Sequence, residues 1–202
     1  MSEPLTAAEI RVLGSLIEKE TTTPEYYPLT LNALVAACNQ KSNRWPVTEF
    51  ADNDVLFTLD SLKARGYAAA ITAGSRVTKY AQRFIEKLNL GRRETAILCV
   101  LMLRGPQTPG EIRSRTGRLY EFADLEELEI VLQKMETLGD MVQRLDPAPG
   151  MKEARWAQTL GGPVDVQSLA AAREASPDRM AALEAEVAKL REEVAELKRL
   201  LS

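Results

Sequence analysis

Apolar residues recur at helical spacing in the N-terminal part of the chain. The segment LTAAEIRVLGSLIEKE opens with Thr6 and, three residues later, Glu9, a pattern that predicts a capping box at the start of a helix. Its apolar positions are Ile10, Leu13, Leu16 and Ile17. After two prolines the helical pattern restarts in LTLNALVAACNQ, with Thr30 as its cap.

A third helical segment, FADNDVLFTLDSLKARG, is expected to have Asp52 or Asn53 as its cap and Gly66 as its stop. The pattern then changes, because YAAAITAGSRVTKYAQRF contains two short strand-like runs on either side of AGS. Such alternation around a turn predicts a β-hairpin. Three helices followed by a hairpin is the order of a winged helix-turn-helix domain.

The same order recurs in residues 89–163. RRETAILCVLMLRG is a strongly apolar helix, and TPGEIRSRTG is a short one with Thr108 as cap, Pro109 at the first position and Gly117 at the end. DLEELEIVLQKMETLGD is the third, and two strands are expected around DPAPG.

Spacing favours a duplicated domain. A shift of 73 positions converts Val55, Leu59, Leu62 and Gly66 into Leu128, Leu132, Met135 and Gly139. Any two amphipathic helices align somewhere, but the repeated ending of helix, glycine and strand favours duplication over chance.

The last 25 residues carry a heptad pattern. Positions a and d are Met180, Leu183, Val187, Leu190, Val194, Leu197 and Leu201. Valine at a with leucine at d favours a parallel two-stranded coiled coil, and Glu186 and Glu193 at g face Arg191 and Lys198 at e in such a dimer. Packing of this helix on its own chain is the alternative.

The expected fold class is therefore α+β, mainly α with small β-hairpins. Two tandem winged helix-turn-helix domains occupy residues 1–88 and 89–163. A linker spans residues 164–177, and a coiled-coil helix that forms a homodimer spans residues 178–202.

The composition argues against several functional classes. No apolar run reaches the roughly 20 residues of a membrane span, and the N-terminus lacks a secretion signal, so we expect a cytoplasmic protein without membrane contact. The chain has no histidine and no nucleotide-binding or nucleophile motif, so we expect no enzyme, no metal and no cofactor. Cys38 and Cys99 lie in apolar segments and are expected to behave as small hydrophobic residues.

Net charge is −3, so nucleic-acid binding would depend on local patches of cations. The candidates lie in the loop CNQKSNRWPV and in the first hairpin: Lys41, Asn43, Arg44, Arg76, Lys79 and Arg83. The hairpin cations are the best candidates for phosphate contacts, since alternation would place Lys79 and Arg83 on one hairpin face. For the hairpin, the alternative is a solvated strand face with ion pairs inside the domain. For the loop, a structural role is favoured, and a contact with phosphates comes second.

Other charges argue against a DNA groove contact. Both third helices begin with carboxylates, which repel phosphates. For the arginines of RSRTGR, pairing with Glu121, Asp124 or the acidic third helix is favoured over DNA contact.

Three segments, NQKSNRWPV, GSRVTKYAQRF and LMLRGPQTPGEIRSRTGRLYEF, resemble the YceH family of bacterial proteins over residues 5–160. The resemblance implies tandem winged-helix domains and no particular chemistry. The resemblance leaves the function open, whereas the predicted winged helices, the local cations and the heptads favour a non-enzymatic, DNA-associated dimeric regulator. The alternative is a protein–protein interaction scaffold that uses the same domains without nucleic acid.

Overall fold

The structure is a computed structural model that describes residues 3–72, 77–147 and 153–164. These residues belong to one compact unit, Met1–Val164. A second unit, Asp165–Ser202, holds most of the predicted linker and the whole heptad segment, and lies outside the described residues. The coiled-coil positions from Met180 to Leu201, and the homodimer, therefore stay predictions.

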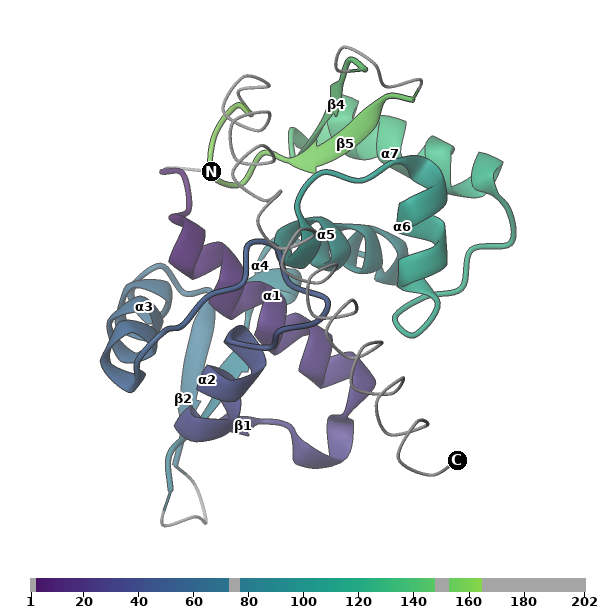
Figure 1. Ribbon diagram of the computed structural model, residues 1–202. Helices are drawn as coiled ribbons and strands as arrows, with labels where there is room; N and C mark the ends of the chain where they lie inside the picture. Colours follow the sequence, from purple (N-terminus) through teal and green to yellow (C-terminus); the bar gives the residue numbers. More distant parts are fainter. Residues whose placement is uncertain (1–2, 73–76, 148–152, 165–202) are drawn as a thin grey trace, which may run out of the picture. The chain divides into compact units, whose positions relative to one another are not determined.

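The first half of the unit begins with the three expected helices. Its elements are α1 (Ala7–Thr22), a 3-10 turn η1 (Pro24–Tyr26), β1 (Leu29–Thr30), α2 (Leu31–Cys38), α3 (Asp52–Ala64), β2 (Ala68–Ile71), β3 (Lys79–Gln82) and α4 (Phe84–Lys87) (Figure 1). The capping box of α1 is confirmed, because the Glu9 backbone N–H donates to Thr6 Oγ1 at 3.2 Å and the Thr6 N–H donates to Glu9 Oε2 at 2.8 Å. Thr30 caps α2 as expected.

The predicted cap of α3 is wrong by one or two residues. The cap residue is Ala51, whose backbone N–H donates to the Asp54 carboxylate at 2.8 Å. Alanine has no side-chain acceptor, so the carboxylate inside the first turn satisfies the helix start instead. The stop at Gly66 is confirmed: its φ of +69° lies in the left-handed region that favours glycine.

The second half repeats this order. It contains α5 (Arg92–Arg104), α6 (Pro109–Thr116), α7 (Leu125–Gly139), β4 (Val142–Leu145) and β5 (Arg155–Gln158). Thr108 and Glu111 form the capping box of α6, with Pro109 at its first position. The predicted helices and hairpin strands of this half are confirmed.

Both hairpins have a short additional partner. The first sheet has the antiparallel order β1-β3-β2, with Leu29 opposite Tyr80. In the second half β4 pairs with β5, and an isolated bridge joins Gln107 to Trp156. Residue 107 lies between the first two helices of its half, as β1 does, so the repeat extends to this contact. The sequence pattern predicted neither β1 nor α4, because two and four residues are too few for a period.

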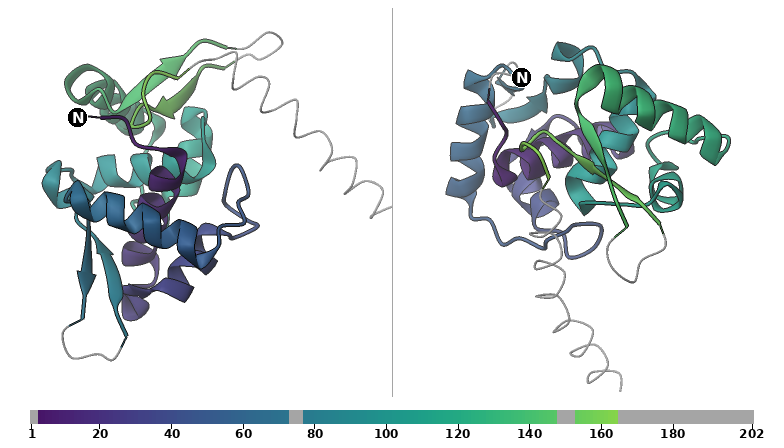
Figure 2. Two further views of the ribbon diagram at one scale, coloured as in Figure 1. Left: turned by 90° about the vertical axis from the view of Figure 1, so that its left-hand side faces the viewer. Right: turned by 90° about the horizontal axis from the view of Figure 1, so that it is seen from above.

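Helices α1 and α5 pack together in the middle of the unit, and the two hairpins lie at its opposite ends (Figures 1 and 2). Gly14 permits this close approach, since a Cβ there would meet Leu103 Cδ2 at 3.0 Å. Residues Ile10–Ile17 and Ala96–Leu103 are buried, because each helix is covered by its own half on one side and by its partner helix on the other. The two halves therefore share one apolar core.

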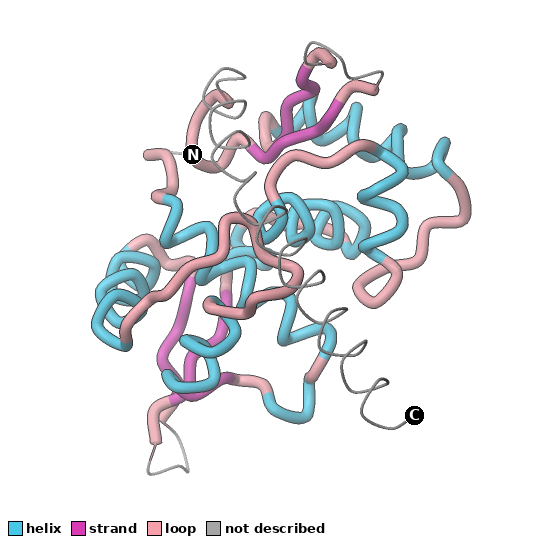
Figure 3. Tube along the Cα trace, viewed as in Figure 1, coloured by secondary structure: helices cyan, strands magenta, loops and turns pink. Residues whose placement is uncertain are grey.

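The architecture is α+β, with mainly helices and small antiparallel sheets (Figure 3). Within the described ranges, no helix is both long and apolar enough to cross a membrane.

Candidate functional site

The loop of residues 39–51 is an ordered connection between α2 and α3. The Asn39 side chain closes it, because Nδ2 donates to the Phe50 carbonyl at 2.8 Å and Oδ1 accepts from the Phe50 N–H at 2.8 Å. The amide thus joins the two ends of the loop.

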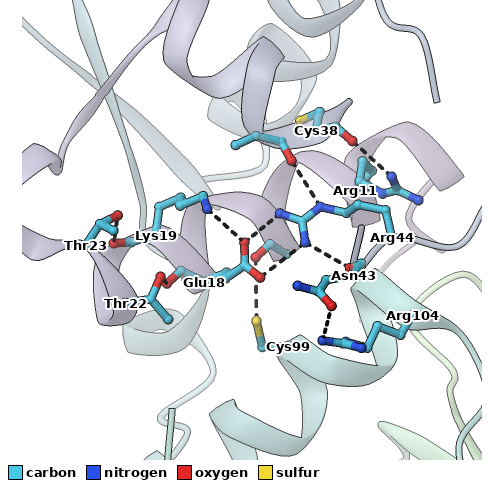
Figure 4. A network of polar contacts seen from close by, with 12 residues as sticks. Arg11, Glu18, Lys19, Thr22, Thr23, Cys38, Asn43, Arg44, Cys99 and Arg104 are labelled. Atoms are coloured by element: carbon cyan, nitrogen blue, oxygen red, sulfur yellow. Dashed lines mark hydrogen bonds and ion pairs between the residues drawn. The ribbon is translucent and has the colours of Figure 1, made fainter. Parts of the chain in front are cut away.

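Arg44 is buried inside this loop. Its guanidinium donates to Glu18 of α1, with Nη2 to Oε2 at 2.5 Å and Nη1 to Oε1 at 3.2 Å (Figure 4). It also donates to the carbonyls of Ala37, at 3.0 Å, and Asn43, at 2.9 Å. Its side chain is 0% exposed, so this residue is not available for a phosphate, and we carry it into no proposal for a nucleic-acid contact.

Glu18 is held ionised by these contacts. Burial alone would raise the pKa of its carboxyl, but the hydrogen bonds and charge of Arg44, followed by the charge of Lys19 at 3.4 Å, outweigh that effect. The pKa of Glu18 therefore lies below its ordinary value of 4.5. This half-buried carboxylate makes a charge-assisted, bidentate pair with Arg44.

Arg11, on α1, is a second buried arginine and one that sequence reasoning missed. Nη1 donates to the Cys38 carbonyl at 3.0 Å and to Thr48 Oγ1 at 3.3 Å, and Nη2 donates to the Pro46 carbonyl at 2.5 Å. Together Arg44 and Arg11 satisfy the carbonyls of Ala37 and Cys38 at the C-terminus of α2. Cations suit that end of a helix, where the macrodipole is negative.

The same loop also contacts the second half. The Trp45 N–H donates to the Leu103 carbonyl at 2.8 Å, and Arg104 Nη2 donates to Asn43 Oδ1 at 2.7 Å (Figure 4). The Trp45 ring lies over Gly105, where a Cβ would meet the ring at 2.4 Å. We call residues 39–51 the clasp loop, because it joins α1 and α2 to the end of α5.

The remaining candidates for nucleic-acid contact, of which Lys41 lies in the clasp loop, do not gather in one place. Lys41 is exposed beyond the C-terminal end of α2. Lys79 lies opposite Thr30 in the β-sheet, and Thr30 is at the N-terminal start of α2. Eight helical residues span about 12 Å, which separates the two cations. Arg76 lies outside the described residues.

Arg83 follows directly after β3, and its backbone N–H still donates to the Tyr67 carbonyl at 2.8 Å before the chain turns into α4. That it shares a hairpin face with Lys79 stays a prediction. Its guanidinium forms an exposed ion pair with Glu86 at 3.3 Å.

The arginines of α6 have structural partners, as expected, but not the predicted ones. Arg113 donates to the Ala123 carbonyl at 2.8 Å, and Arg115 lies 3.7 Å from Glu111. Glu111 also pairs with Arg155 at 2.7 Å.

Both cysteines are free and buried, as expected for small hydrophobic residues. Burial raises the pKa of both thiols, which disfavours the reactive thiolate. Across the described ranges, no group of three His, Cys, Asp or Glu residues is placed to hold a metal ion.

Comparison with known proteins supplies relatives of nearly full length. A family model described as "Protein of unknown function, DUF480" matches residues 5–151. The UPF0502 protein of Solibacter usitatus is 54% identical over 202 residues, covering 98% of this chain and 95% of the relative. UPF0502 proteins of Vibrio atlanticus and Citrifermentans bemidjiense are 45% and 50% identical, covering 100% and 87% of this chain and 98% and 82% of their own lengths.

Proposed function

The chain belongs to the YceH family, described as DUF480 and UPF0502, and we propose that it is a protein-interaction module. In this proposal each half is a winged helix, the C-terminal heptads pair two copies, and the module neither catalyses a reaction nor binds nucleic acid.

The observation that carries the proposal is an exposed apolar side chain at the same place in both halves. Phe57 on α3 is 76% exposed, and Ile130 on α7 is 59% exposed. They are 73 positions apart, the shift that also relates the buried residues of the two helices. Single exposed apolar residues are common on monomers, but chance does not readily place them at equivalent positions, whereas apolar anchors are typical of protein interfaces.

The surroundings of these anchors favour a protein over DNA. Near Phe57, α3 exposes Asp54 and Asp60, and near Ile130, α7 exposes Glu126 and Glu129 alongside Lys134. In DNA-binding winged helices this helix enters the major groove, and carboxylates there would face phosphates and be repelled. Helices α3 and α7 lie on opposite sides of the α1–α5 pair (Figure 2), so the exposed anchors that they carry suit two separate contacts.

The positions of the cations support the same conclusion. Arg44 links the clasp loop to Glu18, and Arg11 donates to the loop carbonyl of Pro46. Arg83 is paired with Glu86. Lys41 and Lys79 remain exposed or half-buried at separate places. A DNA-associated regulator needs a continuous positive face, and these residues do not form one.

The test is recovery of partners by tagged full-length protein from its host. We expect Phe57→Ala with Ile130→Ala to lower recovery of a specific protein partner at least fivefold, because both anchors are removed without disturbing the core. Quantitative mass spectrometry of the recovered proteins measures this, and recovered nucleic acid is measured in parallel. Tyr26→Ala is the matched control, since Tyr26 is 71% exposed but lies in η1. Equal recovery by the double variant and wild type, or recovery of nucleic acid alone, would contradict the proposal.

A further inference from the structure

Helix α7, the β4–β5 hairpin and the start of α6 lie beside one another (Figure 1), and residues of all three line a groove of about 560 Å³. Leu125, Glu129 and Glu136 line it from α7, and Arg144, Glu153 and Trp156 line it from the hairpin side. Spacings of four and seven residues place the three α7 side chains along one strip of the helix surface, beside the strip that enters the core. The volume is within the range of about 300–1,000 Å³ that is typical of ligand sites.

The groove has an excess of negative charge. Three carboxylates line it against one guanidinium, that of Arg144. Glu136 Oε1 accepts a hydrogen bond from the Arg144 backbone N–H at 2.9 Å, whereas Glu129 and Glu153 have no ion pair within the described ranges. Elsewhere Glu9, Glu18, Glu111 and Glu127 each pair with an arginine. Glu129 and Glu153 differ from these carboxylates because no cation within the described ranges pairs with them. Their charges can therefore interact with a ligand.

Apolar surface accompanies this charge. Leu125, which is 45% exposed, and Trp156, which is 5% exposed, both line the groove. Ile130 lies three residues before Gln133, another lining residue, so it is the helical neighbour of the groove wall. The surface available to an occupant therefore continues along α7 beyond the groove itself.

We infer that this groove binds a short basic segment of a partner protein. Arginine or lysine side chains of the segment would pair with Glu129 and Glu153, and an apolar side chain between them would pack on Leu125 and Trp156. The charge of the groove favours a basic segment over a phosphate-bearing ligand, because the same carboxylates would repel phosphates. The inference rests on the proposed function and adds the chemistry of one partner surface to it.

The probe for this site is a dye-labelled peptide of alternating leucine and arginine, and its counterpart with glutamate in place of arginine. We expect the basic peptide to bind the full-length protein with a salt-sensitive affinity and the acidic one not to bind. The chain has two tryptophans, which give two indole N–H signals in NMR spectra. The signal of Trp156 should move on titration, while that of Trp45, which packs on Gly105, should not.

The variant that tests the contact is Glu129→Gln with Glu153→Gln, which removes two charges from exposed side chains and keeps their shape. We expect it to weaken binding of the basic peptide about tenfold. The control, Glu25→Gln with Glu121→Gln, makes the same change of net charge at exposed sites outside the groove and should bind like wild type.

Equal weakening by both double variants, absence of binding, or an unmoved Trp156 signal would overturn the inference. Failure here is separable from failure of the proposed function. If the groove variant recovers host partners like wild type while the Phe57 and Ile130 variant does not, the function stands and the groove assignment falls. Recovery of nucleic acid alone would remove the proposed function whatever the peptide does.

Discussion

Arg44→Ala is expected to lower the free energy of unfolding by about 3 kcal/mol, the low end of the range for breaking a buried ion pair. The substitution leaves the Glu18 carboxylate, whose side chain is only 18% exposed, without its main partner. It also removes the donor to the Ala37 carbonyl at the end of α2. Denaturant unfolding followed by circular dichroism measures the loss.

Arg83→Ala is the matched control, because it removes an arginine from an ion pair whose side chains are 55% and 78% exposed. Exposed pairs contribute about 0–1 kcal/mol, so this variant should unfold nearly like wild type. If Arg44→Ala cost no more than Arg83→Ala, Arg44 would not be the internal link that the geometry indicates, and its role as a surface contact would have to be reconsidered.

Gly105→Ala is expected to destabilise the protein by about 3 kcal/mol for two separate reasons. The backbone at Gly105 has φ +68° and ψ −158°, a region that side chains other than glycine enter at a cost of about 1–3 kcal/mol. In addition, the new Cβ would lie 2.4 Å from the Trp45 ring, so the clasp loop would have to move away from α5. The free energy of unfolding is again the measured quantity.

Gly110→Ala is the control that tests whether the loss of stability is specific to position 105. A Cβ at Gly110 meets only Thr108 Oγ1, at 4.0 Å, and alanine is favoured over glycine in helices, so this variant should be as stable as wild type or slightly more stable. In a Trp45→Ala background, Gly105→Ala should cost less, because only the backbone strain remains. Similar losses at both glycines would show that the contact between Trp45 and Gly105 does not hold the loop.

Periodicity and capping residues were enough to predict most of the fold. Both signals are local: the stripes of α1, α3 and α7 report burial of one face, and the Thr6 and Thr108 boxes report helix starts. The start of α3 was missed because its cap is Ala51, which carries no capping oxygen.

The internal role of the arginines was beyond the reach of the sequence. Arg44 and Glu18 are 26 positions apart and lie on different elements, and no local pattern marks Arg11, one residue from the apolar stripe of α1, as a partner of the clasp loop. The groove likewise joins Leu125 to Trp156 through the fold of the second half. Such pairings follow from packing of elements distant in sequence, which periodicity does not encode.

The central claim of the proposal is that Arg11 and Arg44 serve the fold of this chain and that its third helices contact proteins rather than DNA. Titration of a fluorescent mixed-sequence DNA duplex with the full-length protein at about 50 mM salt tests it most directly, because weak electrostatic binding is strongest at low salt. We predict no saturable binding with a Kd below about 10 µM, the middle of the range for non-specific DNA binding. Saturable, salt-dependent binding below that value, weakened by Lys41→Ala, Lys79→Ala and Arg83→Ala together, would contradict the account.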